Sequence, residues 1–394
     1  MQDAHVESCS FCGKHKDAVQ KLIVSESVAI CNECVTLCQD LLRDQPLDVP
    51  VRRDTRDPQE IRQFLDQYVI GQEQAKITLA VAVVNHYKRL ARTADDPEIA
   101  KANILMLGPT GSGKTLLARS VARYLDVPFA IADATSITEA GYVGDDVETL
   151  ISRLYANANY DLERTQRGII FVDEIDKISR RSESASVTRD VSGEGVQQAL
   201  LKIVEGTVCR VSPQGSRKHP MGETIEVDTT NILFIAGGAF VGLDSIIQRR
   251  RQGTNIGFNS PIADRALSDL SQVRAEDLVR FGMIPEFVGR FPVTVTLDAL
   301  ARDDLLAILT AVKFNLREQY EWLLRQDDIE LQFDSQALEA MVDRALATGT
   351  GARALHSEME RVMMPHMYAA REYARRGIKK LQIDAALINN PSTL

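Results

Sequence analysis

Three observations predict an α/β protein, in which a parallel-sheet domain follows a small zinc-binding domain and precedes a small helical domain. Four cysteines form two close pairs near the N-terminus. In the middle of the chain, a Gly-rich loop of the phosphate-binding type joins an apolar segment to an amphipathic one. From about residue 299 the apolar residues recur with a helical period. We therefore expect a zinc-binding domain over 1–42, a linker over 43–58, a large domain over 59–298 and a small domain over 299–394.

Length and charge narrow the classes of function. A chain of 394 residues is too long for one compact core and should divide into two or three units. Its 46 basic and 55 acidic residues give a net charge of -9, which argues against nucleic acid as the main ligand. The start of the chain lacks a basic stretch followed by an apolar one, and no uncharged apolar run approaches the roughly 18 residues of a membrane span. We expect a cytoplasmic protein that has no membrane partner.

The paired cysteines follow the pattern C-x2-C-x18-C-x2-C: Cys9, Cys12, Cys31 and Cys34. In a reducing compartment, tetrahedral zinc explains two such pairs better than disulfides do, because thiolates at this spacing converge on one ion. A segment of about 40 residues buries too little apolar surface to fold unaided, and structural zinc contributes roughly 10–16 kcal/mol. Free or redox-active thiols are the alternative. Cys38 and Cys209 are expected to pack rather than to bind metal.

The composition changes after the zinc-binding segment. Residues 43–58 combine three prolines with alternating charges and almost no apolar periodicity, which is typical of a semi-flexible linker. From Gln59 the pattern becomes helical, breaks at Val69-Ile70-Gly71-Gln72, and continues as a second helix to about Leu90.

The phosphate-binding loop is Gly108-x4-Gly113-Lys114-Thr115. It follows an apolar strand over Ile104–Leu107 and opens a helix over Leu116–Leu125, which is the context that a P-loop needs. Backbone N–H groups at the helix N-terminus would wrap the phosphates, Lys114 would reach the β and γ oxygens, and the Thr115 hydroxyl would ligate Mg²⁺.

A second apolar strand, Ile169–Val172, ends in Asp173 and Glu174. Parallel sheets bind ligands at the carboxyl ends of their strands, so we expect Asp173 to hold Mg²⁺ through water and Glu174 to polarise an attacking water. A water-activating glutamate indicates a hydrolase. The alternative is that both acids cap the next helix. A further strand over Ile232–Ala236 completes the pattern of a parallel sheet covered by helices.

Two predicted surface loops carry apolar side chains next to glycines. Tyr142 and Val143 lie within AGYVGDD, where they are expected to be displayed, although a tyrosine in an ordinary turn is the alternative. Ile256 and Phe258 flank Gly257 in a polar segment, which indicates docking into hydrophobic clefts of a partner. Folding back onto the same domain is the alternative for this loop.

These motifs occur in the order found in the ClpX family: the paired cysteines, the P-loop, GYVG, VDEID, RKHP and IGF. Over nearly the whole chain the sequence resembles these AAA+ protein unfoldases. The resemblance implies an AAA+ P-loop parallel-sheet domain, a small helical domain, and homohexameric rings with ATP and Mg²⁺ bound between neighbouring subunits. It also implies a ClpP-like peptidase partner, and a zinc domain that dimerises and handles protein substrates and adaptors.

The resemblance assigns nucleotide binding to residues in and around the P-loop: Val69, Ile70, Gly108, Pro109, Thr110, Gly111, Ser112, Gly113, Lys114, Thr115, Leu116 and Asp173. It assigns catalysis to Glu174, to Arg290 as an arginine finger entering the neighbour's site, and to Arg353 as the sensor-2 arginine of its own chain. Two departures from the family occur. Ala354 and His356 replace a glycine and an arginine near Arg353, and the strand end at 236–238 offers no polar sensor side chain.

The resemblance also assigns loops. Tyr142 and Val143 would line an axial pore and grip the translocating polypeptide, with residues 182–195 as the second pore loop. A basic group would attract acidic parts of substrates at the pore entrance, although such a short run is usually just solvated: Arg217, Lys218 and His219. The partner loop for ClpP would contain Ile256, Gly257 and Phe258.

The function that we expect is ATP-dependent unfolding of proteins and their translocation into a peptidase. A remodelling chaperone that works without a peptidase is one alternative, and the partner loop distinguishes it. A zinc-dependent regulator that binds nucleic acid and uses ATP as a switch is another, which the acidic net charge disfavours.

Overall fold

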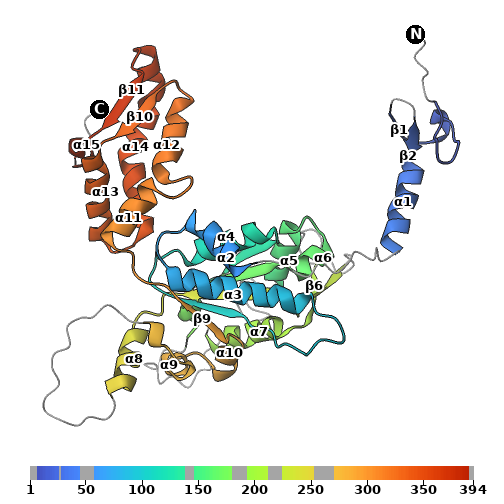
Figure 1. Cartoon of the computed structure of the whole chain (residues 1–394), viewed down its shortest axis with the longest axis horizontal. Coiled ribbons are helices and arrows are strands. Elements are labelled where there is room, and N and C mark those ends of the chain that lie inside the picture. Colours follow the sequence, from blue (N-terminus) through green and yellow to red (C-terminus); the bar gives the residue numbers. More distant parts are fainter. Residues whose placement is uncertain are drawn as a thin grey trace. The chain divides into compact units, whose positions relative to one another are not determined.

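The computed structural model describes residues 7–25, 28–44, 57–137, 146–179, 193–211, 224–252 and 270–389. The chain divides into two compact units, Met1–Thr55 and Arg56–Leu394, whose elements can be followed in Figure 1. Most of the expected linker lies outside the described residues, so the predicted domain boundaries stay predictions. Helix α1 (Asn32–Asp44) and helix α2 (Pro58–Asp66) extend into its two ends.

The first unit is a small zinc-finger-like fold. A short helix η1 (Lys16–Ala18) precedes an antiparallel pair, β1 (Leu22–Val24) and β2 (Ala29–Cys31), and helix α1 follows at once. The buried residues in the described part of this unit are Cys9, Cys31, Cys34 and Ala29, and a few half-buried apolar residues pack against the cysteines: Val19, Leu22 and Ile30. So small an apolar core cannot hold the unit together alone, which agrees with the expectation of a structural metal.

The second unit contains a five-stranded sheet in the order β4-β5-β8-β3-β9, with parallel pairing throughout. Its strands are β3 (Ile104–Leu107), β4 (Phe129–Asp133), β5 (Ile169–Asp173), β8 (Leu233–Gly238) and β9 (Val293–Thr296). The three central strands are those that the sequence predicts, and the parallel pairing is confirmed. The two edge strands, β4 and β9, were not predicted.

Alternate residues of the central strands enter two different cores. Ile104 and Met106 of β3 pack with helices α2, α3 (Glu73–Leu90) and α4 (Lys114–Leu125). Leu105 and Leu107 pack on the opposite face with α5 (Val147–Asn157) and α7 (Glu194–Glu205). Helices therefore cover both faces of the sheet, which leaves the ends of the strands to carry the site.

Shorter elements surround this layer. Those between β4 and β8 are η2 (Ala134–Ser136), α6 (Leu162–Gln166), η3 (Ile175–Ile178) and the antiparallel pair β6 (Val208–Val211) and β7 (Ile225–Asp228). Those after β8 are α8 (Leu243–Gln252), η4 (Leu270–Gln272), α9 (Ala275–Phe281) and α10 (Pro285–Gly289).

The C-terminal part has its own core of buried aliphatic side chains. Its elements are α11 (Arg302–Thr310), α12 (Leu316–Arg325), β10 (Glu330–Phe333), α13 (Ser335–Thr348), α14 (Ala352–Arg375), β11 (Lys380–Ile383) and α15 (Ala385–Asn389). The helical character is confirmed, but a parallel pair, β10 and β11, accompanies the helices. No helix in the described ranges has the length and apolar character that crossing a bilayer demands.

Candidate functional site

The P-loop connects β3 to α4 in a conformation that two glycines permit. Gly111 has a φ of +78° and Gly113 a φ of +102°, a region that residues with a Cβ rarely adopt. Gly113 is the N-cap of α4, and no side chain caps the helix there. The first N–H groups of the helix have no intrahelical acceptor and can donate to a bound anion. The predicted strand, loop and helix are therefore present, and this helix N-terminus suits an anion.

This loop brings together hydrogen-bond donors to which the oxygens of a phosphate group could bind. Lys114 is 8% exposed, and its Nζ donates to the carbonyl oxygens of Gly108 at 2.6 Å and Pro109 at 2.9 Å. Burial lowers the pKa of Lys114, while the charges of Asp173 and Asp176 act in the opposite direction. The buried hydroxyl of Ser112 has no hydrogen-bond partner among the described residues. Phosphate oxygens would complete this donor set, so the residues fit a nucleotide.

Two candidate magnesium ligands meet at the end of β5. The Thr115 hydroxyl donates to Asp173 Oδ2 over 3.0 Å, which brings the P-loop and the acidic strand end together as predicted. Hydroxyl and carboxylate oxygens are suitable Mg²⁺ ligands. Glu174 follows with a φ of +55°, and its N–H donates to Asp173 Oδ1 at 2.9 Å. The exposed Glu174 side chain thus leaves the strand in a left-handed turn, a type of strain that is common at functional sites.

The neighbouring strand end explains why β8 offers no polar side chain. A Cβ on Gly237 would lie 2.7 Å from Phe171 Cζ, and one on Gly238 would lie 2.6 Å from Asp176 Oδ1. Any larger residue would overlap these side chains. Asp176, which the sequence analysis did not single out, is buried here and accepts a hydrogen bond from the N–H of Ala239 at 3.1 Å. Its carboxylate therefore lies beside the strand end at 236–238, where the family would place a polar sensor side chain.

The segment with Arg353 touches the P-loop from the small domain. The N–H of Ala352 donates to the carbonyl oxygen of Gly111 at 3.3 Å, and Gly351 adopts a φ of +62° to allow this approach. Arg353 is exposed and contributes to lowering the pKa of Lys114, after burial, so its charge is felt at the loop. Of the two departures, Ala354 is buried in the small-domain core, whereas His356 is exposed with its Nδ1 3.7 Å from Glu360.

A first prediction follows from the packing at Gly111. A Cβ there would lie 2.3 Å from the carbonyl oxygen of Thr350, and the φ of +78° would be strained. We expect Gly111→Ala to weaken ATP binding by about 5- to 150-fold, because strain of this kind costs about 1–3 kcal/mol. The measurement is the Kd of a fluorescent nucleotide.

Gly377→Ala is the matched control for this prediction. Gly377 has nearly the same φ, +76°, but its Cβ would meet nothing within 4 Å. This variant should lose some stability and keep the wild-type Kd. Unchanged nucleotide binding in Gly111→Ala would contradict the inference that the small domain packs against the nucleotide loop.

Arg290 is the C-cap of helix α10. Its Nε lies 2.8 Å from Glu205 Oε1, and the Arg290 side chain is 54% exposed. Its carbonyl oxygen accepts a hydrogen bond from Asn103 Nδ2 at 2.9 Å. An exposed arginine with one surface ion pair is available to a neighbouring molecule, so the arginine-finger assignment stays a prediction.

Val69 and Ile70 lie in the turn between α2 and α3. This turn is hydrogen-bonded at both ends to the part of the chain that follows β9. The Gln67 carbonyl accepts from the N–H of Lys313 at 2.8 Å, and the Gln72 side chain pairs with the N–H and C=O of Asp298, both at 2.9 Å. Contact of Val69 and Ile70 with a nucleotide remains a prediction.

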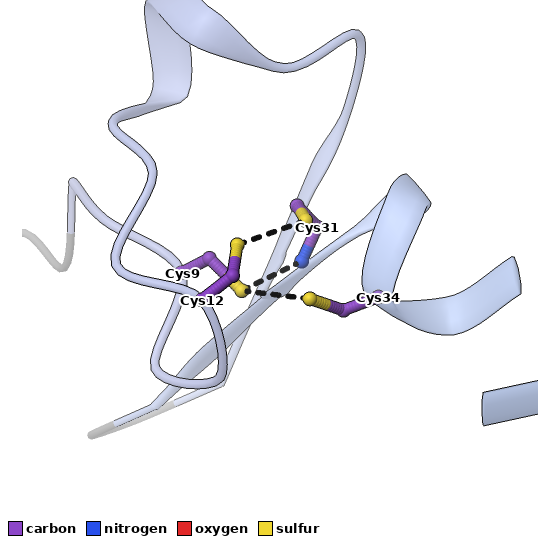
Figure 2. Close-up of side chains that lie close together, drawn as sticks. All are labelled: Cys9, Cys12, Cys31 and Cys34. Atoms are coloured by element: carbon purple, nitrogen blue, oxygen red, sulfur yellow. Dashed lines mark hydrogen bonds between the residues drawn. The ribbon is translucent and has the colours of Figure 1, made fainter. Parts of the chain in front are cut away.

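The four paired cysteines meet in the first unit. Figure 2 shows their side chains pointing toward one another, with Cys31 at the end of β2 and Cys34 on α1. All four sulfur atoms lie within 4.8 Å of one another. Cys9 Sγ lies 3.9 Å from Cys34 Sγ, and Cys12 Sγ lies 3.7 Å from Cys31 Sγ. A tetrahedral zinc with Zn–S bonds of about 2.3 Å places its sulfurs about 3.8 Å apart, so the residues fit this ion.

The surroundings favour a thiolate at Cys9, whereas the hydrogen bond with Cys12, burial and the other two cysteines raise the pKa of Cys34. Burial raises the pKa of Cys9, but backbone N–H groups, including that of Cys31 at 3.3 Å, outweigh it and lower the pKa to about 6. A low pKa favours the thiolate that a metal requires. Cys209 is buried in β6, where burial raises its pKa to about 11, as expected for a packing residue.

The loop assignments lie outside the described residues. This concerns Tyr142 and Val143, residues 182–192 of the second loop, the basic group at 217–219 and the partner loop at 256–258. The described elements bracket two of these loops, because β6 and β7 flank the basic group, and α8 and η4 flank the partner loop.

Models of known protein families match three parts of the chain. The ClpX C4-type zinc finger matches residues 7–44, the AAA domain of the Cdc48 subfamily matches residues 99–294, and the C-terminal D2-small domain of ClpB protein matches residues 300–382. The ATP-dependent Clp protease ATP-binding subunit ClpX of Treponema denticola is 48% identical, with 98% of this chain and 94% of that protein covered. The predicted fold class and the ATP, Mg²⁺ and Zn²⁺ cofactors are therefore confirmed. With this identity over nearly its whole length, the chain belongs to the ClpX family of AAA+ ATPases.

Proposed function

We propose that this protein is an ATP-dependent unfoldase that pulls substrate proteins through the pore of a homohexamer and delivers them to a ClpP-like peptidase. The observation that carries the proposal is the nucleotide site: Lys114, the Thr115–Asp173 pair and Glu174 converge in a chain that also has a ClpX-type zinc finger. Domains are stable by about 5–15 kcal/mol, so pulling one apart requires repeated hydrolysis rather than one binding event.

Each residue of the site has one proposed task. ATP with Mg²⁺ supplies the reactive γ-phosphate when bound. Lys114 and the P-loop N–H groups hold the phosphates, and Thr115 and Asp173 hold the metal. Glu174 orients and polarises the attacking water. Arg290 of one subunit and Arg353 of the other add positive charge at the γ-phosphate, where a finger in trans contributes about 10³–10⁵-fold in related enzymes.

The remaining assignments concern contacts with other proteins. Tyr142 and Val143 give non-directional contact area to any polypeptide, which suits a motor for many sequences. The basic group at 217–219 attracts acidic ends of substrates. The zinc domain dimerises and receives substrates and adaptors. The protein acts in the cytoplasm, without nucleic acid, in keeping with the net charge of -9.

The experiment that tests the proposal follows a stable fluorescent protein with an unstructured C-terminal tag. Wild type and ATP should abolish its native fluorescence without any peptidase, and Glu174→Gln should leave it intact. Hydrolysis by wild type without loss of fluorescence, for a series of tags and with adaptors, would contradict the unfoldase assignment. A binding assay with labelled DNA and RNA tests the regulator alternative, which predicts an affinity that weakens steeply as the salt concentration rises.

A second prediction separates delivery to a peptidase from remodelling alone. Phe258→Ala should abolish stimulation of the peptidase and leave ATP hydrolysis and unfolding unchanged, because six loops per ring act by avidity and each contact is weak. The measurement is the peptidase-dependent release of peptides. Asn255→Ala, a polar position of the same segment, is the control. Undiminished degradation by Phe258→Ala would favour the peptidase-free remodeller.

A further inference from the structure

Helix α7 carries a glutamine that is completely buried. Gln197 is 0% exposed, and both ends of its amide are hydrogen-bonded to backbone groups of other elements. Its Nε2 donates to the carbonyl oxygen of Ile178 at 2.8 Å, and its Oε1 accepts from the N–H of Ile284 at 2.9 Å. Burying an amide is costly unless both ends are satisfied, so this side chain is held in one orientation.

The two backbone groups belong to the two halves of the hydrolysis machinery. Ile178 ends η3, the short helix that begins directly after Glu174. Ile284 is the N-cap of α10, and Arg290 is the C-cap of the same helix. Gln197 therefore joins the segment of the water-activating glutamate to the short helix that presents the candidate arginine finger.

Two further contacts hold Arg290, and one of them also involves a residue of α7. Glu205, the last residue of α7, forms the ion pair with Arg290 Nε. The two side chains are 54% and 43% exposed, and surface pairs of this kind hold weakly. Asn103, 2% exposed, donates to the Arg290 carbonyl and accepts from the N–H of Phe234 at 3.2 Å. The backbone at Arg290 is therefore fixed while its side chain stays available.

We propose that Gln197 is a positioning residue, which sets the place of Arg290 relative to the Glu174 segment of the same subunit. The inference rests on the proposed role of Arg290 in the neighbour's site. Through this amide, a movement of the segment after Glu174 is passed to the finger that acts on the next subunit. The state of one nucleotide site thereby affects hydrolysis in the adjacent site.

The test begins with Gln197→Leu, which has a similar volume but neither donor nor acceptor. The expected result is a fall of about 10- to 100-fold in kcat for ATP hydrolysis, because two buried backbone groups lose their partner and α10 shifts. The Kd of a fluorescent nucleotide should not change. Gln198→Leu is the matched control, because Gln198 is the next residue of α7 and is exposed, and among the described residues its side chain bonds to Glu194 of the same helix at 3.2 Å. Its kcat should equal that of wild type.

A double-mutant cycle with Arg290→Ala shows whether Gln197 acts through Arg290. The expected result is that Gln197→Leu with Arg290→Ala is no slower than Arg290→Ala alone, since a misplaced finger and an absent finger are equivalent. Losses that multiply would overturn the inference and leave the finger assignment intact. A normal kcat in Arg290→Ala would instead refute the finger assignment, and the inference with it.

Gln197→Glu gives a second readout if the leucine variant does not assemble into rings. An ionised carboxylate still accepts from the Ile284 N–H but repels the Ile178 carbonyl, whereas a protonated carboxyl can donate to it. Burial raises the pKa of such a carboxyl. The ratio of the variant's kcat to that of wild type should therefore rise as the pH falls. A ratio that stays constant with pH would show that the bond to Ile178 does not position Arg290.

Discussion

Glu174→Gln is expected to lower kcat for ATP hydrolysis by about 10²–10⁴-fold, the usual contribution of a positioned general base. The amide has the same shape but cannot take up a proton from water. The backbone geometry should survive, because the left-handed turn at Glu174 is held by its N–H, which donates to Asp173 Oδ1. Nucleotide affinity should therefore remain, since the Lys114 and Thr115 contacts do not involve the Glu174 side chain.

The measurement combines steady-state hydrolysis with nucleotide binding in the same preparation. Glu163→Gln serves as the control, because Glu163 is an exposed glutamate of α6 whose contact is with Arg167 at 3.9 Å. Its kcat should not change. Substantial hydrolysis by Glu174→Gln would mean that another group activates the water. Asp176 would be the first candidate, because its buried carboxylate lies in the same segment.

The core of the site could be predicted from the sequence because its signals are local. The P-loop glycines, Lys114 and the acids after β5 all adjoin short apolar runs, and such runs form the buried central strands of a parallel sheet. Edge strand β9 gave no such signal, since its residues are mostly half-buried. The long helical stretch after residue 302 is broken without glycine or proline, because the side chain of Asn315 caps α12 by accepting from the Glu318 N–H at 2.9 Å.

The positioning residues could not be predicted, because their partners are distant in sequence. Gln197 is followed by another glutamine on an amphipathic helix, and nothing in the pattern tells which of the two is buried. Gln72 pairs with the backbone of Asp298 across most of the large domain. Such residues bond to main-chain groups, which have no sequence signature. Only the packing of α7 against α10 and η3 identifies Gln197.

The second large effect concerns zinc. We expect Cys31→Ser to unfold the first unit, because structural zinc contributes roughly 10–16 kcal/mol in comparable small domains, and the apolar core here is small. Cys31 is 0% exposed, so the substitution removes a fully buried ligand, while the backbone N–H of residue 31 can still donate to Cys9 Sγ. Zinc content, together with protease sensitivity of the segment before residue 45, measures the effect in the full chain.

ATP hydrolysis should persist in Cys31→Ser, since the nucleotide site lies entirely in the second unit. Cys38→Ser is the matched control, because Cys38 lies on the same helix as Cys34 but outside the group of four converging sulfurs. It should retain zinc and resist protease.

A chelator should reproduce the Cys31→Ser result in wild type. Retention of one zinc ion by Cys31→Ser would contradict the four-cysteine site, and loss of zinc from Cys38→Ser would point to a different set of ligands. Because the thiols must lose protons to bind metal, the affinity for zinc should fall as the pH falls.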